Sequence, residues 1–529
     1  MFCVFTHFSK NYNMKLTKSK KTKTVSLEAK NKAKLKDPIL WFTQRFKDVY
    51  DRHGVPLDMS LKSEQNVETT TKVSRVMELN DAFFAAVFGE LGYPDAPTHY
   101  TQGSFYRYNT DTGIYDQISD GALETRICAL LHRCAKEVNG KKVDVGPLMF
   151  KLSNSARLCG VIKRAKALLE KPDTFFDNTD AAFIPCNNGM LRFEDKELLP
   201  FNKSYHIRNK LDVDYVRDAK CPLFLGKLLG DALELDQINL AQRWGGMALL
   251  GENMDHRIIL IMGTSGGGKS TFINAMIGVI GQNNIGELRT DQLCARFELG
   301  NLLGKTVLIG NDVPSDFLLK PGATKLKSMV AGDPMSAEIK GATGQISVKG
   351  AFNVAIASNS VVCVNIDQDL EAWRRRILPL IFNKPKPKNK DTGLLKKILD
   401  QEKPGVLNWM LDGLDALRKD NFHFALNENL MKQTDDFLMS SRAPERFVED
   451  CLEEREGAKL TKEKVTKSYH EYCKERDWPM GGSKSYPGRI AAKIEHLFGI
   501  TVSNNIKAEG KEDGQVKGWH GVGIKGADM

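Results

Sequence analysis

The stretch IILIMGTSGGGKSTFINAMIG, residues 258–278, decides the fold class of this chain. Five apolar residues run into a loop with four glycines, and a helix-like apolar pattern follows Lys269, Ser270 and Thr271. Residues 263–270 match the pattern G-x-x-x-x-G-K-S/T, and they stand between a predicted strand and a predicted helix, as this pattern requires. The stretch therefore predicts an α/β domain with a phosphate-binding loop, the P-loop.

This loop has the chemistry of a nucleoside triphosphate site. Its glycines allow backbone N–H groups to close around a β-phosphate, and the N-terminus of the following helix favours anions. The Lys269 ammonium can reach the β- and γ-phosphates, and the Ser270 hydroxyl suits Mg²⁺. We therefore expect ATP and Mg²⁺ as cofactors. The residues expected to contact the nucleotide are Gly263, Thr264, Ser265, Gly266, Gly267, Gly268, Lys269, Ser270 and Thr271.

Two later strands are expected to end beside this loop. KTVLIG ends at Asn311 and Asp312, which places a carboxylate where Mg²⁺ or an attacking water needs one. FNVAIAS ends at Asn359, an amide able to orient a water near the γ-phosphate. Asn and Asp are also common turn residues and helix caps, but three strands ending in P-loop, acid and amide favour one shared site. We therefore predict Ser270 and Asp312 as metal ligands and Asn359 as the γ-phosphate sensor.

Three adjacent arginines, residues 374–376, follow in the segment DLEAWRRRILPLIF. Adjacent side chains cannot all face one site, so the run is either a solvated basic face or the source of one arginine finger. In the second interpretation, Arg374 or Arg375 completes the ATP site of a neighbouring subunit. That interpretation requires a ring or a filament, because head-to-tail contacts generate such assemblies.

The segment between the acid and the amide, LKSMVAGDPMSAEIKGATGQISVKGAF (residues 326–352), predicts a hairpin with a glycine-rich tip. Lys340 and Lys349 lie on this hairpin. A lysine-bearing loop that rises from a ring ATPase can follow a nucleic-acid backbone through the pore. The alternative is a surface hairpin with two solvated lysines. Lys340 and Lys349 are therefore our candidate DNA contacts.

The composition is that of a globular protein with about three domains, because 529 residues exceed a single core and 41% are hydrophobic. The ten cysteines contain no C-x-x-C pair, so neither a zinc ribbon nor a disulfide framework is indicated. No apolar run approaches the roughly 18 to 20 residues of a membrane span, and the apolar start is too short for a secretory signal. We expect a cytoplasmic protein of a bacterial host or a virus-infected cell, without a membrane partner.

The formal net charge of +10 is concentrated at the N-terminus. Residues 1–36 hold ten lysines and one acid, Glu28, so +9 belongs to this segment and about +1 to the remainder. We expect the segment to be disordered and able to contact phosphates nonspecifically. The alternatives are a solvated tail or an upstream extension ahead of a true start at Met14.

The remaining chain divides by pattern. Helical patterns mix with short strands ahead of residue 226, including hairpins at Asn109 to Gly113 and at Asn188-Gly189, whereas strands alternate with helices over 256–383, as in a parallel α/β sheet. The predicted domains are a disordered basic tail (1–36), an N-terminal α+β domain (37–225), a P-loop core with leading helices (226–390), a helical extension (391–440) and a small mixed unit (441–529).

The order of these motifs resembles superfamily-3 helicases, in particular the phage and plasmid primase-helicase group that includes the poxvirus primase-helicase. The resemblance covers about residues 100–529: GTSGGGKST is similar to Walker A, VLIGND to Walker B, AIASNS to motif C and AWRRRILPLIF to the arginine-finger segment. CNNGMLRF, ELLPF, LDVDY and AKCPLF resemble the N-terminal domain of that group. The last part resembles a winged-helix unit, in which SKSYPGRIAAKIEHLFGI is either a DNA-recognition helix carrying Lys484, Arg489 and Lys493 or part of a winged helix that docks on protein.

The resemblance implies a P-loop AAA+-like ATPase core between an α+β N-terminal domain and a C-terminal winged-helix-like domain. It further implies an ATP-dependent DNA helicase that forms a hexameric ring on single-stranded or forked DNA. This helicase would serve the replication of a phage, plasmid or virus-like element. A separate primase or polymerase is the further partner expected. The alternative from a different functional class is an ATP-switched, DNA-binding replication initiator or loader that does not unwind DNA.

Overall fold

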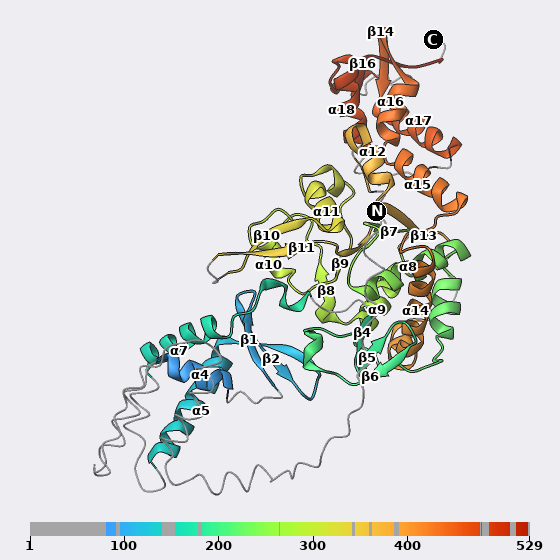
Figure 1. Ribbon diagram of the computed structural model, residues 1–529. Helices are drawn as coiled ribbons and strands as arrows, with labels where there is room; N and C mark the ends of the chain where they lie inside the picture. The colour runs from blue at the N-terminus through green and yellow to red at the C-terminus, as the bar shows by residue number, and fades with distance from the viewer. Residues whose placement is uncertain are drawn as a thin grey trace. The chain divides into compact units, whose positions relative to one another are not determined.

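The computed structural model describes most of the chain after residue 80 (Figure 1). The described residues are 81–90, 96–139, 154–177, 182–263, 265–340, 344–358, 362–364, 366–385, 391–476, 478, 486–507 and 515–526. The basic segment 1–36 lies outside them. The chain forms two compact units, one of residues 1–94 with 119–169 and one of residues 95–118 with 170–529.

The described part of the first unit contains α4 (Asp81–Glu90), α5 (Asp120–Asn139) and α7 (Ser155–Leu168). The apolar sequence of α4 packs on α7, and an ion pair of 2.8 Å joins Arg157 Nη1 to Asp81 Oδ1 across this contact. The Asn154 side chain accepts the Arg157 N–H and so caps the start of α7.

The second unit begins with two small antiparallel sheets that confirm both predicted hairpins. Their strands are β1 (Thr98–Thr101), β2 (Ser104–Asn109) and β3 (Ile114–Ile118), then β4 (Phe183–Cys186), β5 (Gly189–Arg192) and β6 (Glu197–Leu199). In the first hairpin, Gly113 has a φ of 75°, which suits glycine, and the Asn109 carboxamide accepts the Asp111 N–H. Short 3₁₀ turns, η2 (Asp173–Phe176) and η3 (Lys203–Tyr205), accompany these sheets.

A five-stranded parallel sheet follows, in the order β13-β7-β12-β9-β8. Its strands are β7 (Ile258–Gly263), β8 (Ile285–Glu287), β9 (Val307–Gly310), β12 (Asn353–Ala357) and β13 (Ile377–Phe382). The apolar runs RIILIM, KTVLIG, FNVAIAS and ILPLIF therefore form strands, as predicted, and their parallel pairing brings all carboxyl ends to one edge. The chain is a mixed α/β protein.

Strands β7, β9, β12 and β13 are largely apolar on both faces because helices cover both sides of the sheet. Ile259 and Ile261 of β7 point into one core, whereas Ile258 and Leu260 point into the other. The second core includes α11 (Gly322–Ala331), α12 (Ile366–Arg374) and α15 (Glu428–Ser440). The alternation of side chains along one strand thus accounts for the unbroken apolar sequence.

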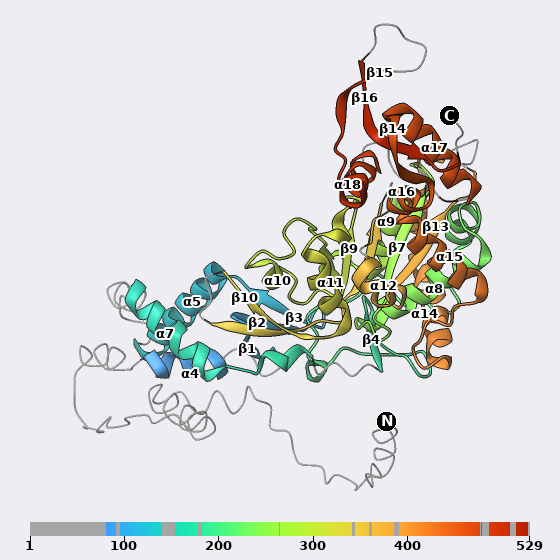
Figure 2. The ribbon, with the colours of Figure 1, turned by 90° about the horizontal axis from the view of Figure 1, so that it is seen from above.

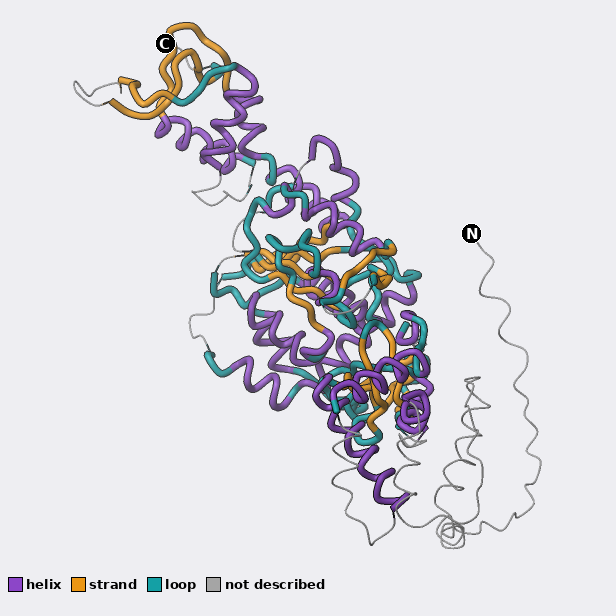
Figure 3. Tube along the Cα trace, turned by 90° about the vertical axis from the view of Figure 1, so that its left-hand side faces the viewer, coloured by secondary structure: helices purple, strands orange, loops and turns teal. Residues whose placement is uncertain are grey.

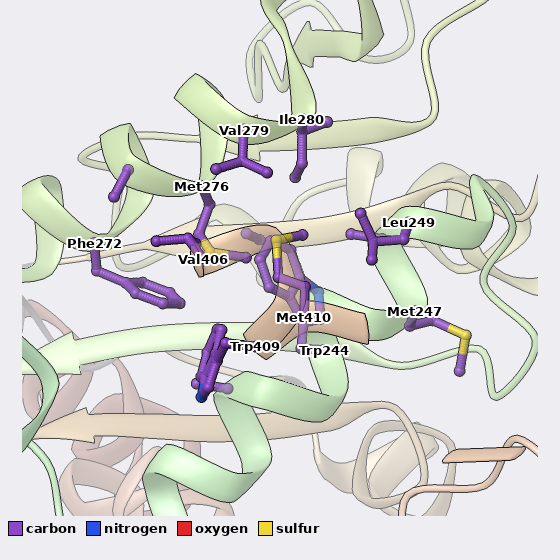
Figure 4. Close-up of a cluster of buried hydrophobic side chains, with 14 of the residues drawn as sticks. Trp244, Met247, Leu249, Phe272, Met276, Val279, Ile280, Val406, Trp409 and Met410 are labelled. Carbon is purple, nitrogen blue, oxygen red and sulfur yellow. The ribbon is translucent and has the colours of Figure 1, made fainter. Parts of the chain in front are cut away.

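The first core is built on the helix that follows the P-loop. It contains the π-helix η4 (Leu223–Gly230) and α8 (Leu235–Leu250), α9 (Lys269–Ile280), α13 (Leu394–Gln401) and α14 (Lys403–Lys419). Figure 4 shows Phe272 and Met276 of α9 beside Trp409 and Met410 of α14. The P-loop helix is therefore fixed to the sheet by packing that does not involve its phosphate-facing end.

Helices α8 and α14 approach closely at a pair of glycines. A Cβ atom at Gly246 would lie 2.3 Å from the Leu414 backbone nitrogen, and one at Gly413 would lie 2.0 Å from the Gln242 carbonyl oxygen. Both glycines are therefore required by the distance between the helices.

The chain ends in helices and an antiparallel sheet of order β14-β16-β15, seen beside the C-terminus in Figure 3. Its elements are α16 (Ala443–Cys451), β14 (Leu452–Thr461), α17 (Lys462–Glu475), α18 (Tyr486–Phe498), β15 (Ser503–Lys507) and β16 (Gln515–Ile524). Phe447, Tyr469, Ile490 and Trp519 share its own core. The mixed content predicted for 441–529 is confirmed, and the winged-helix assignment stays a prediction. No helix in the described part of the chain is long and apolar enough to cross a membrane.

Candidate nucleotide-binding site

The glycines of the P-loop adopt backbone conformations that other residues disfavour. The φ angles are 138° at Gly263, 78° at Gly266 and 103° at Gly268. A Cβ at Gly263 would also lie 2.3 Å from the Phe382 carbonyl oxygen, because β13 runs directly beside the loop. The structure thus requires glycine at these positions for the loop geometry.

Lys269 begins α9 and is buried, with 7% of its surface exposed. Its Nζ donates to the Gly263 carbonyl oxygen at 2.6 Å, so the ammonium lies across the loop. Gly268 is the N-cap of α9 and has no side chain to satisfy the first N–H groups of the helix, which favours an anion there. Ser270 is exposed and Thr271 half-buried, whereas Thr264 lies outside the described residues.

The strand ends beside the P-loop are joined by hydrogen bonds across β12. The Val313 N–H donates to the Ala357 carbonyl oxygen at 3.1 Å, and the Ser358 N–H donates to the Ile261 carbonyl oxygen at 3.1 Å. The Ser358 hydroxyl donates to the Val313 carbonyl oxygen at 3.2 Å. Because β12 lies between β7 and β9, the turns that follow these strands share one edge of the sheet.

Asp312 lies on this edge, immediately before Val313, with an exposed side chain and a φ of 49°. Asn359 follows Ser358 but lies outside the described residues, so its role as sensor stays a prediction. Mg²⁺ is usually held by one or two protein oxygens together with substrate phosphates. Ser270 and Asp312 offer a hydroxyl and a carboxylate of that kind, both exposed, so the chemistry of this donor pair is compatible with Mg²⁺. Among the described residues, no three His, Cys, Asp or Glu side chains gather to hold a metal ion by themselves.

The two candidate arginine fingers differ in their surroundings. Arg374 Nε donates to Asp435 Oδ1 of α15 at 2.7 Å, and its Nη1 donates to Glu371 at 2.5 Å. The Arg375 side chain is exposed and has no hydrogen-bond or ion-pair partner among the described residues. Sequence alone could not separate the two, because the Asp435 partner is 61 residues away. Of the two candidates, Arg375 is therefore the one whose side chain is exposed and unpaired within the described part of the chain.

The predicted hairpin is confirmed as β10 (Pro334–Glu338) and β11 (Gln345–Lys349), which pair in antiparallel register. Figure 1 labels both strands, and Figure 2 shows β10 from above. Lys340 follows β10 and is exposed. Lys349 at the base of the hairpin pairs with Glu252 at 2.5 Å. Arg296 hydrogen-bonds to Glu338 and holds the pKa of that carboxyl below its ordinary value. Each strand of the hairpin is thus joined to a neighbouring segment by one surface ion pair.

The helix predicted to recognise DNA, α18, uses its basic side chains inside the protein. Arg489 forms two hydrogen bonds with Glu445 of α16 at 2.6 and 2.7 Å, and also donates to the Ser441 carbonyl oxygen and to Cys363 Sγ. Lys493 pairs with Glu449 at 2.6 Å. Both predicted DNA contacts are therefore held by α16, and Lys484 lies outside the described residues. No local sequence pattern indicates this pairing, because Glu445 lies 44 residues before Arg489.

Arg489→Ala is expected to lower the free energy of unfolding by about 2 to 3 kcal/mol, because it leaves the largely buried Glu445 carboxylate without its charged partner. Thermal unfolding of the full chain, together with limited proteolysis followed at sites within residues 441–529, measures the effect. Lys467→Ala, an exposed change on α17, is the matched control. Equal melting temperatures for the two variants would show that the Arg489 contacts do not stabilise the C-terminal unit.

Comparison with protein families gives two matches. Residues 261–376 match a family of unknown function, DUF5906, and residues 97–234 match the family described as D5 N terminal like. The first match spans the P-loop, Asp312, the hairpin and the arginine run. The D5 N terminal like domain is found in primase-helicase proteins, so the chain is primase-helicase-like over that segment.

None of the curated proteins matches this chain. Solved structures that match include three apo structures of the NrS-1 C terminal region, at 12%, 11% and 12% sequence identity and TM-scores of 0.42, 0.41 and 0.38. Each covers 84% of this chain, and the matches cover 100%, 99% and 100% of those chains.

Proposed function

We propose that the chain is an ATP-dependent, ring-forming DNA helicase of superfamily 3 that serves the replication of a phage, plasmid or virus-like element. The observation that carries this proposal is the common edge of the parallel sheet, where the P-loop after β7 and Asp312 after β9 flank the end of β12. The match of the preceding residues 97–234 to a domain of primase-helicase proteins supports it.

In this proposal the chain's own residues bind and orient the nucleotide. Backbone N–H groups of the P-loop and the Lys269 ammonium neutralise the β- and γ-phosphates, and Ser270 and Asp312 hold the metal. Mg²⁺ supplies further charge neutralisation at the phosphates when it is bound. Asp312 and Asn359 orient the attacking water, and Arg375 reaches the γ-phosphate from the neighbouring subunit.

Because Arg375 is proposed to act across a subunit boundary, the subunits must assemble head to tail, as a ring or a filament. We propose a hexamer that encircles single-stranded DNA at a fork, with Lys340 and Lys349 of the hairpin following the phosphate backbone. A primase or polymerase on a separate chain is the expected replication partner.

Strand displacement on a forked DNA duplex tests the proposal. The full chain with ATP and Mg²⁺ is expected to release the labelled strand, and the same reaction with a non-hydrolysable ATP analogue is expected to release none. Stimulation of ATP hydrolysis by single-stranded DNA is the companion measurement. ATP-dependent DNA binding without displacement would favour a replication initiator or loader and overturn the helicase.

Deletion of residues 1–36 is expected to weaken nonspecific DNA binding and to flatten its salt dependence, because +9 of the net charge of +10 is lost. Unwinding at saturating DNA should be retained. Fluorescence anisotropy with a labelled oligonucleotide over a range of salt concentrations measures both affinity and slope. An unchanged slope would show that the basic segment does not contact phosphates.

A further inference from the structure

A cavity of about 310 Å³ lies at the edge of the parallel sheet opposite the P-loop. Its wall includes Asn284, Thr306 and Phe352, which directly precede β8, β9 and β12. The P-loop and Asp312 follow the other ends of their strands. The cavity is therefore separate from the candidate ATP site, and its volume lies at the lower end of the range for ligand sites.

Arg208 faces this cavity and is held in place by neutral groups. Its Nη1 donates to Gln102 Oε1, and its guanidinium lies over the Phe176 ring at 4.9 Å. It also lies against Gly304, where φ is 75° and a Cβ would be 2.8 Å from Arg208 Nε. The backbone conformation at Gly304 and the position of the guanidinium thus both exclude a larger residue there.

Lys305 is a second cation on the same wall. The Asn209 side chain donates to the carbonyl oxygen of Gly304, the residue before Lys305, at 2.6 Å and so holds the backbone there. Lys305 Nζ donates to the Asn283 carbonyl oxygen at 3.0 Å, and burial lowers the pKa of this ammonium. In the part of the chain that the structure describes, neither Arg208 nor Lys305 forms an ion pair with a carboxylate. The hydrogen bonds of both half-buried cations thus go to neutral groups, and desolvation of a cation is costly unless an anion offsets it.

The foot of the hairpin adds a third cation to this cavity. Lys349 lines it together with Glu252, its ion-pair partner, and Asp177. Burial raises the pKa of Asp177, whereas Arg208 and Lys349 both act to lower it, so these charges lie near one another. Three cations and two carboxylates therefore line the cavity, and the excess is positive.

We propose that this cavity binds phosphate groups of a single nucleic-acid strand, through Arg208 and Lys305 beside Lys349 of the hairpin. A phosphate would supply the ionic partner that the half-buried Lys305 lacks and would offset the positive excess that remains beside Arg208 and Asp177. The position of the cavity at the hairpin foot also places it next to the element proposed to follow DNA. The inference rests on DNA as the ligand of the proposed function, but it does not depend on ATP hydrolysis.

Anisotropy of a fluorescein-labelled oligothymidylate, measured with the full chain and no nucleotide, tests this site. Arg208→Gln and Lys305→Met remove charge and keep most of the side-chain volume. Lys432→Met is the matched control. Lys432 is exposed on α15, and this helix packs beside β13, the edge strand on the opposite side of the sheet from β8. Each cavity variant is expected to raise Kd on the order of tenfold and to reduce the slope of log Kd against log salt by about 0.7. Equal melting temperatures establish that the variants are folded.

The outcomes separate this inference from the proposed function. Cavity variants that bind like Lys432→Met, in a chain whose ATP hydrolysis still responds to DNA, would overturn the cavity alone. A wild-type chain that binds no oligothymidylate would overturn both the cavity and the DNA ligand. If an excess of thymidine monophosphate displaces the oligonucleotide, the ligand of the cavity is a mononucleotide and not a nucleic-acid strand, which would overturn the inference. A Lys269→Ala chain that retains oligothymidylate binding would support a site independent of the P-loop.

Discussion

Lys269→Ala is expected to abolish ATP hydrolysis while the chain stays folded. The Lys269 ammonium lies across the P-loop and donates a hydrogen bond to the Gly263 carbonyl oxygen. From that position it can reach the β- and γ-phosphates of a bound nucleotide. Its removal deletes positive charge where negative charge is neutralised during phosphoryl transfer. Phosphate release from ATP, measured with and without single-stranded DNA, is the assay.

A control on the same helix separates chemistry from folding. Asn274 lies on α9, one turn beyond the P-loop, and its side chain is exposed. Asn274→Ala is expected to hydrolyse ATP at the wild-type rate, and both variants should melt near the wild-type temperature because Phe272 and Met276 of α9 still pack in the first core. Near-normal turnover by Lys269→Ala would overturn the P-loop assignment.

The strands and the position of the glycine loop between β7 and α9 were predictable because their signals are local. An apolar run such as RIILIM reads as a strand covered on both faces, and the position of Gly263 to Ser270 between a strand and a helix fixes where the loop must stand. The hairpins also follow local turn chemistry, as at Asn109 to Gly113. Parallel pairing then brings Asp312 to the edge that holds the P-loop.

The roles of the basic side chains were not predictable, since their partners lie far along the chain. Arg374 pairs with Asp435, and Arg489 pairs with Glu445 in another helix, so neither is available in the way that the sequence suggested. Lys305 joins Arg208 at one cavity across 97 residues, since the chain returns to the same edge of the sheet between strands. Sequence identifies a cation, whereas the tertiary fold determines which anion it meets.

Arg375→Ala is expected to bind ATP almost normally and to hydrolyse it poorly. An arginine finger offsets the charge that develops on the transferred phosphoryl group and is worth on the order of 10³ to 10⁵ in rate in other nucleotide hydrolases. The exposed Arg375 side chain has no partner among the described residues of its own chain, as a finger that acts on a neighbour requires. Binding of a fluorescent ATP analogue and steady-state phosphate release measure the two effects separately.

Arg374→Ala is the matched control for this experiment. Its partner Asp435 and its own side chain are both partly exposed, so loss of this pair should cost at most about 1 kcal/mol of stability and leave hydrolysis near the wild-type rate. The opposite result, with hydrolysis lost in Arg374→Ala and retained in Arg375→Ala, would assign the finger to Arg374. Full activity in both variants would leave the run as a basic surface.

Mixing Arg375→Ala with Lys269→Ala tests whether the finger acts between subunits. Each variant alone has every site damaged, because all pockets lack Lys269 in one ring and all fingers are missing in the other. In a mixed ring, a pocket from an Arg375→Ala subunit can lie beside a subunit that still carries Arg375, so such interfaces are complete and part of the activity should return. A finger acting within its own subunit predicts no recovery at any mixing ratio, since no chain then carries both residues. ATP hydrolysis should therefore rise and fall with the ratio of the two variants and should be absent when either variant is mixed with buffer. Such a recovery requires a neighbouring subunit to supply the arginine.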